Sequence, residues 1–139
     1  MKEYSYLFFD CDGVILNSNN IKTEAFFEVA KEFGIKKANK LVEYHINNGG
    51  ISRFQKIKYF QENIIFNHNK EIYQRLIKKY GEIVKKELLK SDISYGIYEI
   101  RDFFPKSNFA IISGSDQTEL RWVFRNLNLD YIFNLGIYG

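Results

Sequence analysis

The sequence has few residues that cross-link a chain or break it into loops. It holds one cysteine, one proline and two histidines in 139 residues. The single cysteine, Cys11, excludes an intramolecular disulfide, and the histidines have no partner at a metal-ligand spacing, which argues against a zinc site. Hydrophobic residues make up 45% of the chain, which excludes the polar, proline-rich type of disordered sequence. We therefore expect a folded protein.

Long apolar runs and blocks of one charge are also missing. No stretch reaches the roughly 18 apolar residues of a membrane span, and acids interrupt the N-terminal segment before a signal-like region develops. The net charge of +3 comes from Lys and Arg scattered along the chain, without the basic block of a nucleic-acid tail. We expect a cytoplasmic protein with a mild preference for anionic ligands and with no nucleic-acid or membrane partner. The oligomeric state stays open.

Apolar runs that stop at polar loops predict strands. Residues 5–9, Ser-Tyr-Leu-Phe-Phe, end at Asp-Cys-Asp-Gly, and residues 108–112, Asn-Phe-Ala-Ile-Ile, end at Ser-Gly-Ser. This pattern is typical of buried strands in a parallel sheet. Open α/β sheets bind ligands at the carboxyl ends of such strands. A third strand is expected within residues 131–138.

Apolar residues at spacings of three or four predict helices between these strands. The pattern covers about residues 21–33, 51–64 and 70–89, and a further helix follows Ser115 or Asp116 as its N-cap. At 139 residues the chain is too short to promise two independent domains. We expect one α/β unit, residues 1–15 and 91–139, interrupted by a helical insertion, residues 16–90.

The first strand end carries two acids. Asp10 and Asp12 flank Cys11, so an extended backbone turns both carboxylates to one side and the thiol to the other. Carboxylates this close repel each other unless a cation separates them. Mg²⁺ suits this role, because it combines one or two carboxylates with waters and substrate phosphate. One carboxylate can then attack phosphorus while the other manages the proton.

Small residues complete a predicted phosphate site. Gly13 allows a sharp turn beneath a bound phosphate. Ser113 and Gly114 supply a hydroxyl and a bare N–H at the next strand end, ahead of a helix N-terminus that favours anions. Asp-Cys-Asp-Gly alone could be a surface turn, but two strand ends carrying this combination favour a functional site.

The motifs resemble those of haloacid dehalogenase (HAD) superfamily phosphatases. Phe-Phe-Asp-Cys-Asp-Gly-Val-Ile-Leu-Asn-Ser resembles the first motif of the superfamily, and Ala-Ile-Ile-Ser-Gly-Ser resembles the second. The helical insertion is similar to the cap of the phosphoglycolate phosphatase and β-phosphoglucomutase branch. The resemblance implies a Rossmann-like α/β core with an inserted helical cap. The family's third-motif Lys and fourth-motif acids lie beyond the strand near Tyr131, so we expect an incomplete parallel sheet and impaired activity.

The resemblance also implies a role for each residue. Asp10 forms an aspartyl-phosphate, Asp12 protonates the leaving group and later activates water, and Ser113 holds a phosphate oxygen. The Asp10 carboxylate and the Asp12 backbone carbonyl bind Mg²⁺. In the insertion, Arg53 and Lys56 lie one turn apart, and they either meet the far end of the substrate or form a solvated basic stripe.

The leading hypothesis is Mg²⁺-dependent hydrolysis of a small phosphorylated metabolite, such as a sugar phosphate or a phosphoglycolate-like ester. One alternative is a sugar phosphomutase, which shares both aspartates and returns the phosphoryl group to the substrate. The other is an inactive phosphate-binding or interaction module.

Overall fold

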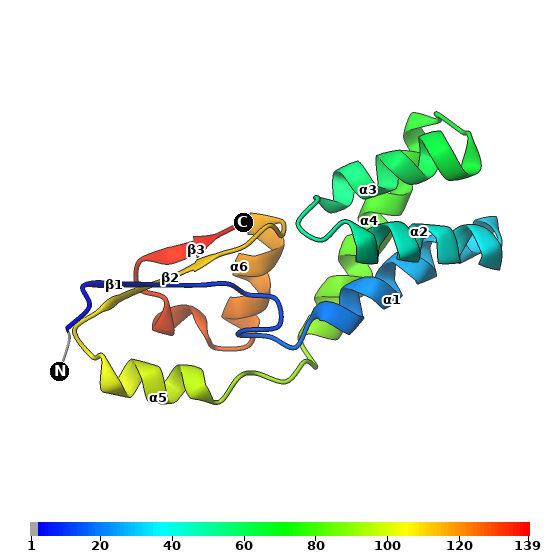
Figure 1. Ribbon diagram of the computed structural model, residues 1–139. Helices are drawn as coiled ribbons and strands as arrows, with labels where there is room; N and C mark the ends of the chain where they lie inside the picture. The colour runs from blue at the N-terminus through cyan, green and yellow to red at the C-terminus, as the bar shows by residue number, and fades with distance from the viewer. Residues whose placement is uncertain (1–2) are drawn as a thin grey trace. The chain divides into compact units, whose positions relative to one another are not determined.

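The computed structural model describes residues 3–139, which divide into two compact units. One unit combines the N-terminal segment up to Asn19 with Leu88–Gly139, and the other is Asn20–Glu87. The first unit contains a parallel sheet with helices, and the second is helical (Figure 1). The fold is therefore α/β, as the sequence predicts. Within residues 3–139 no helix is both long and apolar enough to cross a membrane.

The sheet of the α/β unit consists of three parallel strands in the order β1-β2-β3 (Figure 1). These are β1 (Tyr6–Phe9), β2 (Asn108–Ile112) and β3 (Gly136–Tyr138). The predicted strands at residues 5–9, 108–112 and within 131–138 are thus confirmed. The third segment starts with a 3₁₀ turn, Asp130–Ile132, before its strand.

Two helices, α5 (Gly96–Phe103) and α6 (Gln117–Asn126), belong to the crossovers that parallel strands require. The helix α6 was predicted, and Asp116 is its N-cap, because the Asp116 carboxylate accepts the N–H of Glu119 at 2.9 Å. The helix α5 was not predicted. It has eight residues, and only one of them, Ile97, is buried.

The two faces of the sheet differ in burial. On one face, Phe9 and Phe109 pack with ring centroids 5.2 Å apart, and Arg101 of α5 lies 4.8 Å from the Phe109 ring. On the other face, the side chains of Tyr6 and Phe8 are 58% and 60% exposed. The expectation of a buried strand is therefore wrong for this face of β1. Helices that follow right-handed crossovers in one direction cover one face of a sheet only.

The helical unit follows the predicted order of segments. Its elements are α1 (Asn19–Ala30), a 3₁₀ turn (Lys31–Phe33), α2 (Ile35–Asn47), α3 (Arg53–Tyr59), a π-helical turn (Phe60–Ile65) and α4 (Lys70–Leu88). The helices predicted near 21–33, 51–64 and 70–89 are confirmed, although the second changes to π-helical geometry at Phe60. The helix α2 had no separate prediction, but it lies within the insertion, residues 16–90, that was expected to be helical.

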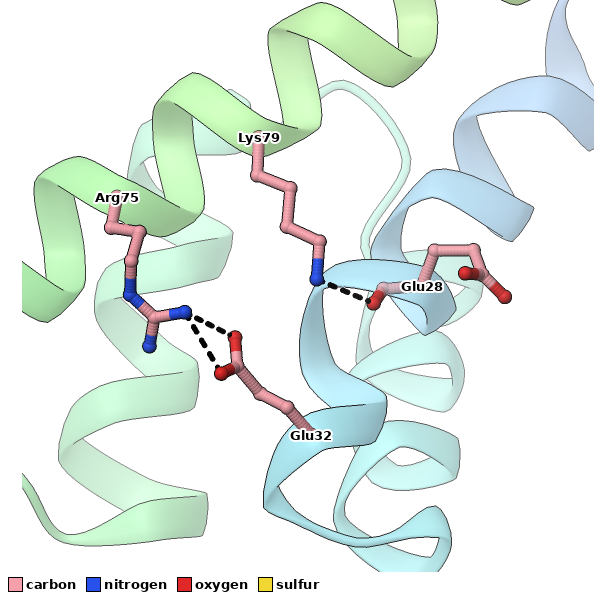
Figure 2. Close-up of polar contacts among 4 residues, drawn as sticks. All are labelled: Glu28, Glu32, Arg75 and Lys79. Atoms are coloured by element: carbon pink, nitrogen blue, oxygen red, sulfur yellow. Dashed lines mark hydrogen bonds and ion pairs between the residues drawn. The ribbon is translucent and has the colours of Figure 1, made fainter.

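The helical unit is held by an apolar core and by a few polar contacts. Phe26 packs against Tyr80 with ring centroids 4.4 Å apart, and both side chains are buried. On the surface, Arg75 Nη1 lies 2.8 Å from both carboxylate oxygens of Glu32, and Lys79 Nζ donates to the Glu28 carbonyl at 3.4 Å (Figure 2). These contacts join α4 to the α1 region, but exposed ion pairs of this kind contribute at most about 1 kcal/mol.

Candidate active site

The first motif forms a tight turn at the carboxyl end of β1. Asp10 is exposed, Cys11 is buried with 1% of its surface accessible, and Asp12 is half-buried. The thiol thus faces the interior, as the alternation of side chains predicts. The Cys11 carbonyl accepts the N–H groups of Ile15 and Leu16 at 2.9 and 3.0 Å, which closes the turn.

Gly13 has a backbone conformation that other residues rarely adopt. Its φ is +72°, and a Cβ at this position would lie 2.8 Å from Nδ2 of Asn19. The dihedral angle therefore favours glycine, whereas the Asn19 amide is the end of a flexible side chain that can move away. The carboxylate of Asp10 in turn accepts the N–H of Cys11 at 2.7 Å, which orients one of its oxygens along the turn.

Asp12 accepts hydrogen bonds from two serine hydroxyls. Ser18 Oγ donates to Asp12 Oδ1 at 2.5 Å, and Ser115 Oγ donates to Asp12 Oδ2 at 3.3 Å. Ser18 is fully buried. Ser18 and Ser115 are the last residues of the two quoted motifs, but the sequence predicted no role for Ser18 and only that of a candidate helix cap for Ser115. The burial of a serine in a loop depends on distant segments of the chain, so no local signal could have identified either contact.

The second motif follows the neighbouring strand. Phe9 pairs with Ile111, so Asp10 and Ser113 come after adjacent strands at the same edge of the sheet. Ser113 is half-buried, its N–H donates to the Tyr138 carbonyl at 3.0 Å, and its Oγ accepts the N–H of Ser115 at 3.2 Å. Gly114 beside it is exposed. This edge therefore combines carboxylates, hydroxyls and an accessible backbone.

The donor set at this edge suits a hard cation. Among residues 3–139 no group of three or more His, Cys, Asp or Glu side chains is arranged to hold a metal, so a metal site made of protein side chains alone is absent there. Mg²⁺ commonly binds one or two carboxylates and completes its shell with waters and substrate phosphate. Asp10 and Asp12 can provide the one or two carboxylates that Mg²⁺ needs from the protein.

Arg53 and Lys56 both lie on α3 in the helical unit. The Arg53 guanidinium carbon is 5.4 Å from the centroid of the Tyr80 ring. Lys56 is only 3% exposed, and its Nζ lies 2.8 Å from Nδ1 of His45 and 3.4 Å from the His45 carbonyl oxygen. For Lys56 the interpretation as a solvated stripe is therefore wrong.

The pKa values of both His45 and Lys56 are lowered. Burial, followed by the charges of Lys56 and Lys22, lowers the pKa of His45 to about 4. Burial, followed by the charge of Lys22, also lowers the pKa of Lys56 below its usual value. At neutral pH the His45 ring is therefore uncharged, and its Nδ1 accepts a hydrogen bond from Lys56.

A parallel α/β sheet with two acids after one strand and a serine after the next is typical of a Rossmann-like core that binds a ligand at its strand ends. The sequence pattern of the haloacid dehalogenase-like hydrolases matches residues 7–139. The chain therefore belongs to this family, which confirms the resemblance inferred from its motifs. No curated protein matches the sequence.

Solved structures of related fold extend this comparison. A candidate β-phosphoglucomutase from Thermotoga maritima is 18% identical, with a TM-score of 0.66, and the match covers 98% of this chain and 62% of that one. A candidate phosphoglycolate phosphatase from Lactobacillus plantarum is 17% identical, with a TM-score of 0.66 and coverages of 99% and 62%. A magnesium-bound candidate HAD hydrolase, YfnB from Bacillus subtilis, is 15% identical, with a TM-score of 0.67 and coverages of 98% and 65%. At these identities the comparison shows the fold, and the chain spans less than two thirds of each of these structures.

Proposed function

We propose that this protein hydrolyses a small phosphate monoester through an aspartyl-phosphate on Asp10. The observation that carries the proposal is the exposed Asp10 carboxylate at the end of β1, beside a second acid, Asp12, that hydroxyl groups hold in place. Two acids in different environments can take different roles, one as nucleophile and one as proton carrier.

The reaction proceeds in two steps. An oxygen of Asp10 attacks phosphorus, the bond to the ester oxygen breaks, and the alcohol leaves with a proton from Asp12. Water then attacks phosphorus and gives its proton to Asp12, which releases inorganic phosphate and restores both acids. The Ser113 hydroxyl and the Gly114 N–H bind the phosphoryl oxygens during both steps. Gly13 contributes the turn beneath the phosphate, because its own N–H donates to the Leu16 carbonyl at 2.8 Å.

A divalent cation is part of the proposal. The Asp10 carboxylate and the Asp12 backbone carbonyl are the groups suited to hold it, and a bound Mg²⁺ supplies charge neutralisation at the transferring group. The magnesium-bound relative from Bacillus subtilis supports this choice of metal.

Arg53 is proposed to contribute to substrate recognition, whereas Lys56 is buried and its Nζ contacts His45. The positive charge of Arg53 favours a substrate whose non-reacting part is polar or anionic, as in sugar phosphates. A sugar phosphomutase is the second candidate, because one of the similar structures is described as a candidate β-phosphoglucomutase.

The test compares the wild-type chain with Asp10→Asn and Asp130→Asn in assays of p-nitrophenyl phosphate and sugar phosphates with Mg²⁺. Asp130 is exposed in the 3₁₀ turn of the same unit, so Asp130→Asn is a control for the loss of one carboxylate. We expect Asp10→Asn to lose activity by about 10³-fold or more, as expected for a nucleophile, and Asp130→Asn to retain it. Equal activity in all three proteins would refute the proposal, and transfer of phosphate between sugar positions would identify the mutase.

A further inference from the structure

The carboxylate of Asp12 is held at both oxygens by hydroxyls from different loops. Ser18 lies six residues after Asp12, whereas Ser115 lies 103 residues after it, beyond the end of β2. All three residues belong to the α/β unit. Because each hydroxyl takes a different oxygen, the two contacts together restrict rotation of the carboxylate about its last bond.

The loop that carries Ser18 is itself fixed by the chain. The Ser18 N–H donates to the Leu16 carbonyl at 2.9 Å, and the neighbouring Asn17 N–H donates to the Asp92 carbonyl at 3.1 Å. Leu16 also forms an antiparallel bridge with Ile93. Ser18 is fully buried, so its hydroxyl needs a partner inside the protein. Asp12 is that partner.

Ser115 links Asp12 to the second motif. Its N–H donates to Ser113 Oγ at 3.2 Å, and its hydroxyl donates to Asp12 at 3.3 Å. The residue therefore contacts both the proposed phosphate-binding hydroxyl and the proposed proton carrier. Any movement of the Ser115 backbone changes the relative placement of these two groups.

We infer that Ser18 and Ser115 are positioning residues, which aim the Asp12 carboxylate for proton transfer; this inference rests on the proposed phosphatase function. A positioned acid or base accelerates a reaction by about 10² to 10⁴-fold. A displacement of about 1 Å can lower the rate by about 10²-fold. We expect Ser18→Ala to lower kcat by about 10 to 100-fold with KM changed less than about twofold. Ser115→Ala has a smaller effect, because its hydrogen bond is longer.

The kinetic test uses variants that separate positioning from simple loss of stability. Ser18→Thr keeps the hydroxyl and restores kcat. Ser107→Ala is the matched control, because Ser107 is also buried and bonded, to the Tyr4 carbonyl, but it lies at the other end of β2. In an Asp12→Asn background, Ser18→Ala causes no further loss. Equal losses from Ser107→Ala, or additive losses in the double variant, would overturn the inference.

A second readout does not depend on turnover. The side-chain carboxyl carbons of aspartate are followed by NMR, and the Asp12 signal is identified as the one missing from Asp12→Asn. Ser18→Ala shifts this signal, whereas Ser18→Thr and Ser107→Ala leave it in place. An unmoved signal refutes the inference even in an active enzyme. If Ser18→Ala shifts the signal but the wild-type chain has no phosphatase activity, the proposed function is refuted. The Ser18 contact is then only a structural hydrogen bond.

Discussion

The neutral imidazole of His45 makes the stability of the helical unit depend on pH. The ring lies 4.7 Å from the Phe26 ring, and its Nδ1 accepts from Lys56 at 2.8 Å. Burial and the charges of Lys56 and Lys22 lower its pKa from 6.5 to about 4. A proton added to His45 in the folded protein would place two cations in contact.

The sign and the size of the effect follow from this pKa. As the pH falls below 6.5, His45 becomes protonated in the unfolded chain, whereas in the folded chain it stays neutral down to about pH 4. The stability linked to neutral His45 is therefore fully present above pH 6.5 and is lost as the pH falls from 6.5 to about 4. A pKa reduced from 6.5 to about 4 corresponds to about 3 kcal/mol. Because the His45 ring is only half-buried, solvent screens part of this free energy, and we expect the free energy of unfolding to fall by about 2 kcal/mol.

The assay is urea unfolding followed by circular dichroism, at about pH 7.5 and about pH 4.5, for the wild type and His45→Gln. Glutamine keeps an acceptor for Lys56 but does not titrate. Between the two pH values, the free energy of unfolding of the wild type should therefore fall by about 2 kcal/mol more than that of the variant. An NMR titration of His45 reads the same group directly. A His45 pKa near 6.5, or equal acid losses in the two proteins, would refute the reasoning.

Two further predictions concern packing and surface charge. Phe109 is fully buried, so Phe109→Ala should cost about 3–5 kcal/mol of unfolding free energy, whereas Phe8→Ala, at a side chain 60% exposed, should cost less than about 1 kcal/mol. The fluorescence of Trp122, the single tryptophan, follows the unfolding of this unit, and similar losses in the two variants would contradict the assignment of the sheet faces. Arg75→Ala removes the ion pair with Glu32 and should cost at most about 1 kcal/mol, an effect that about 1 M salt abolishes. A larger loss that persists in high salt would show that the Arg75 side chain stabilises by packing.

The features that the sequence predicted are those with local signals. The strands ending at Asp10 and Ser113 were identifiable because each combines an apolar run with an abrupt polar turn, and Asp116 was identifiable as a cap by its place before a helical pattern. The helix α5 was missed because its eight residues are fewer than the roughly 11 to 18 over which a helical period is recognised.

The errors arose where burial is decided by distant parts of the chain. The exposure of Phe8 depends on which face of the sheet the crossovers cover. The burial of Lys56 depends on His45 and Phe26, which lie on other helices of the same unit. Ser18 could not be connected to Asp12 without knowing how residues 92–94 close over the first loop.

The pairing of β1 with β2 also has a consequence for the order of folding. Tyr6 pairs with Asn108, so 108 − 6 = 102 positions separate the partners, and closing a flexible loop of that length costs about 4 kcal/mol of chain entropy. The helical unit, Asn20–Glu87, accounts for 68 of these positions, because 87 − 20 + 1 = 68. Helices form from neighbouring residues within about a microsecond. If this unit folds first, 102 − 68 = 34 flexible positions remain, and the closure cost falls by about 1 kcal/mol. Prior folding of the insertion thus shortens the search by which the two halves of the candidate active site find each other.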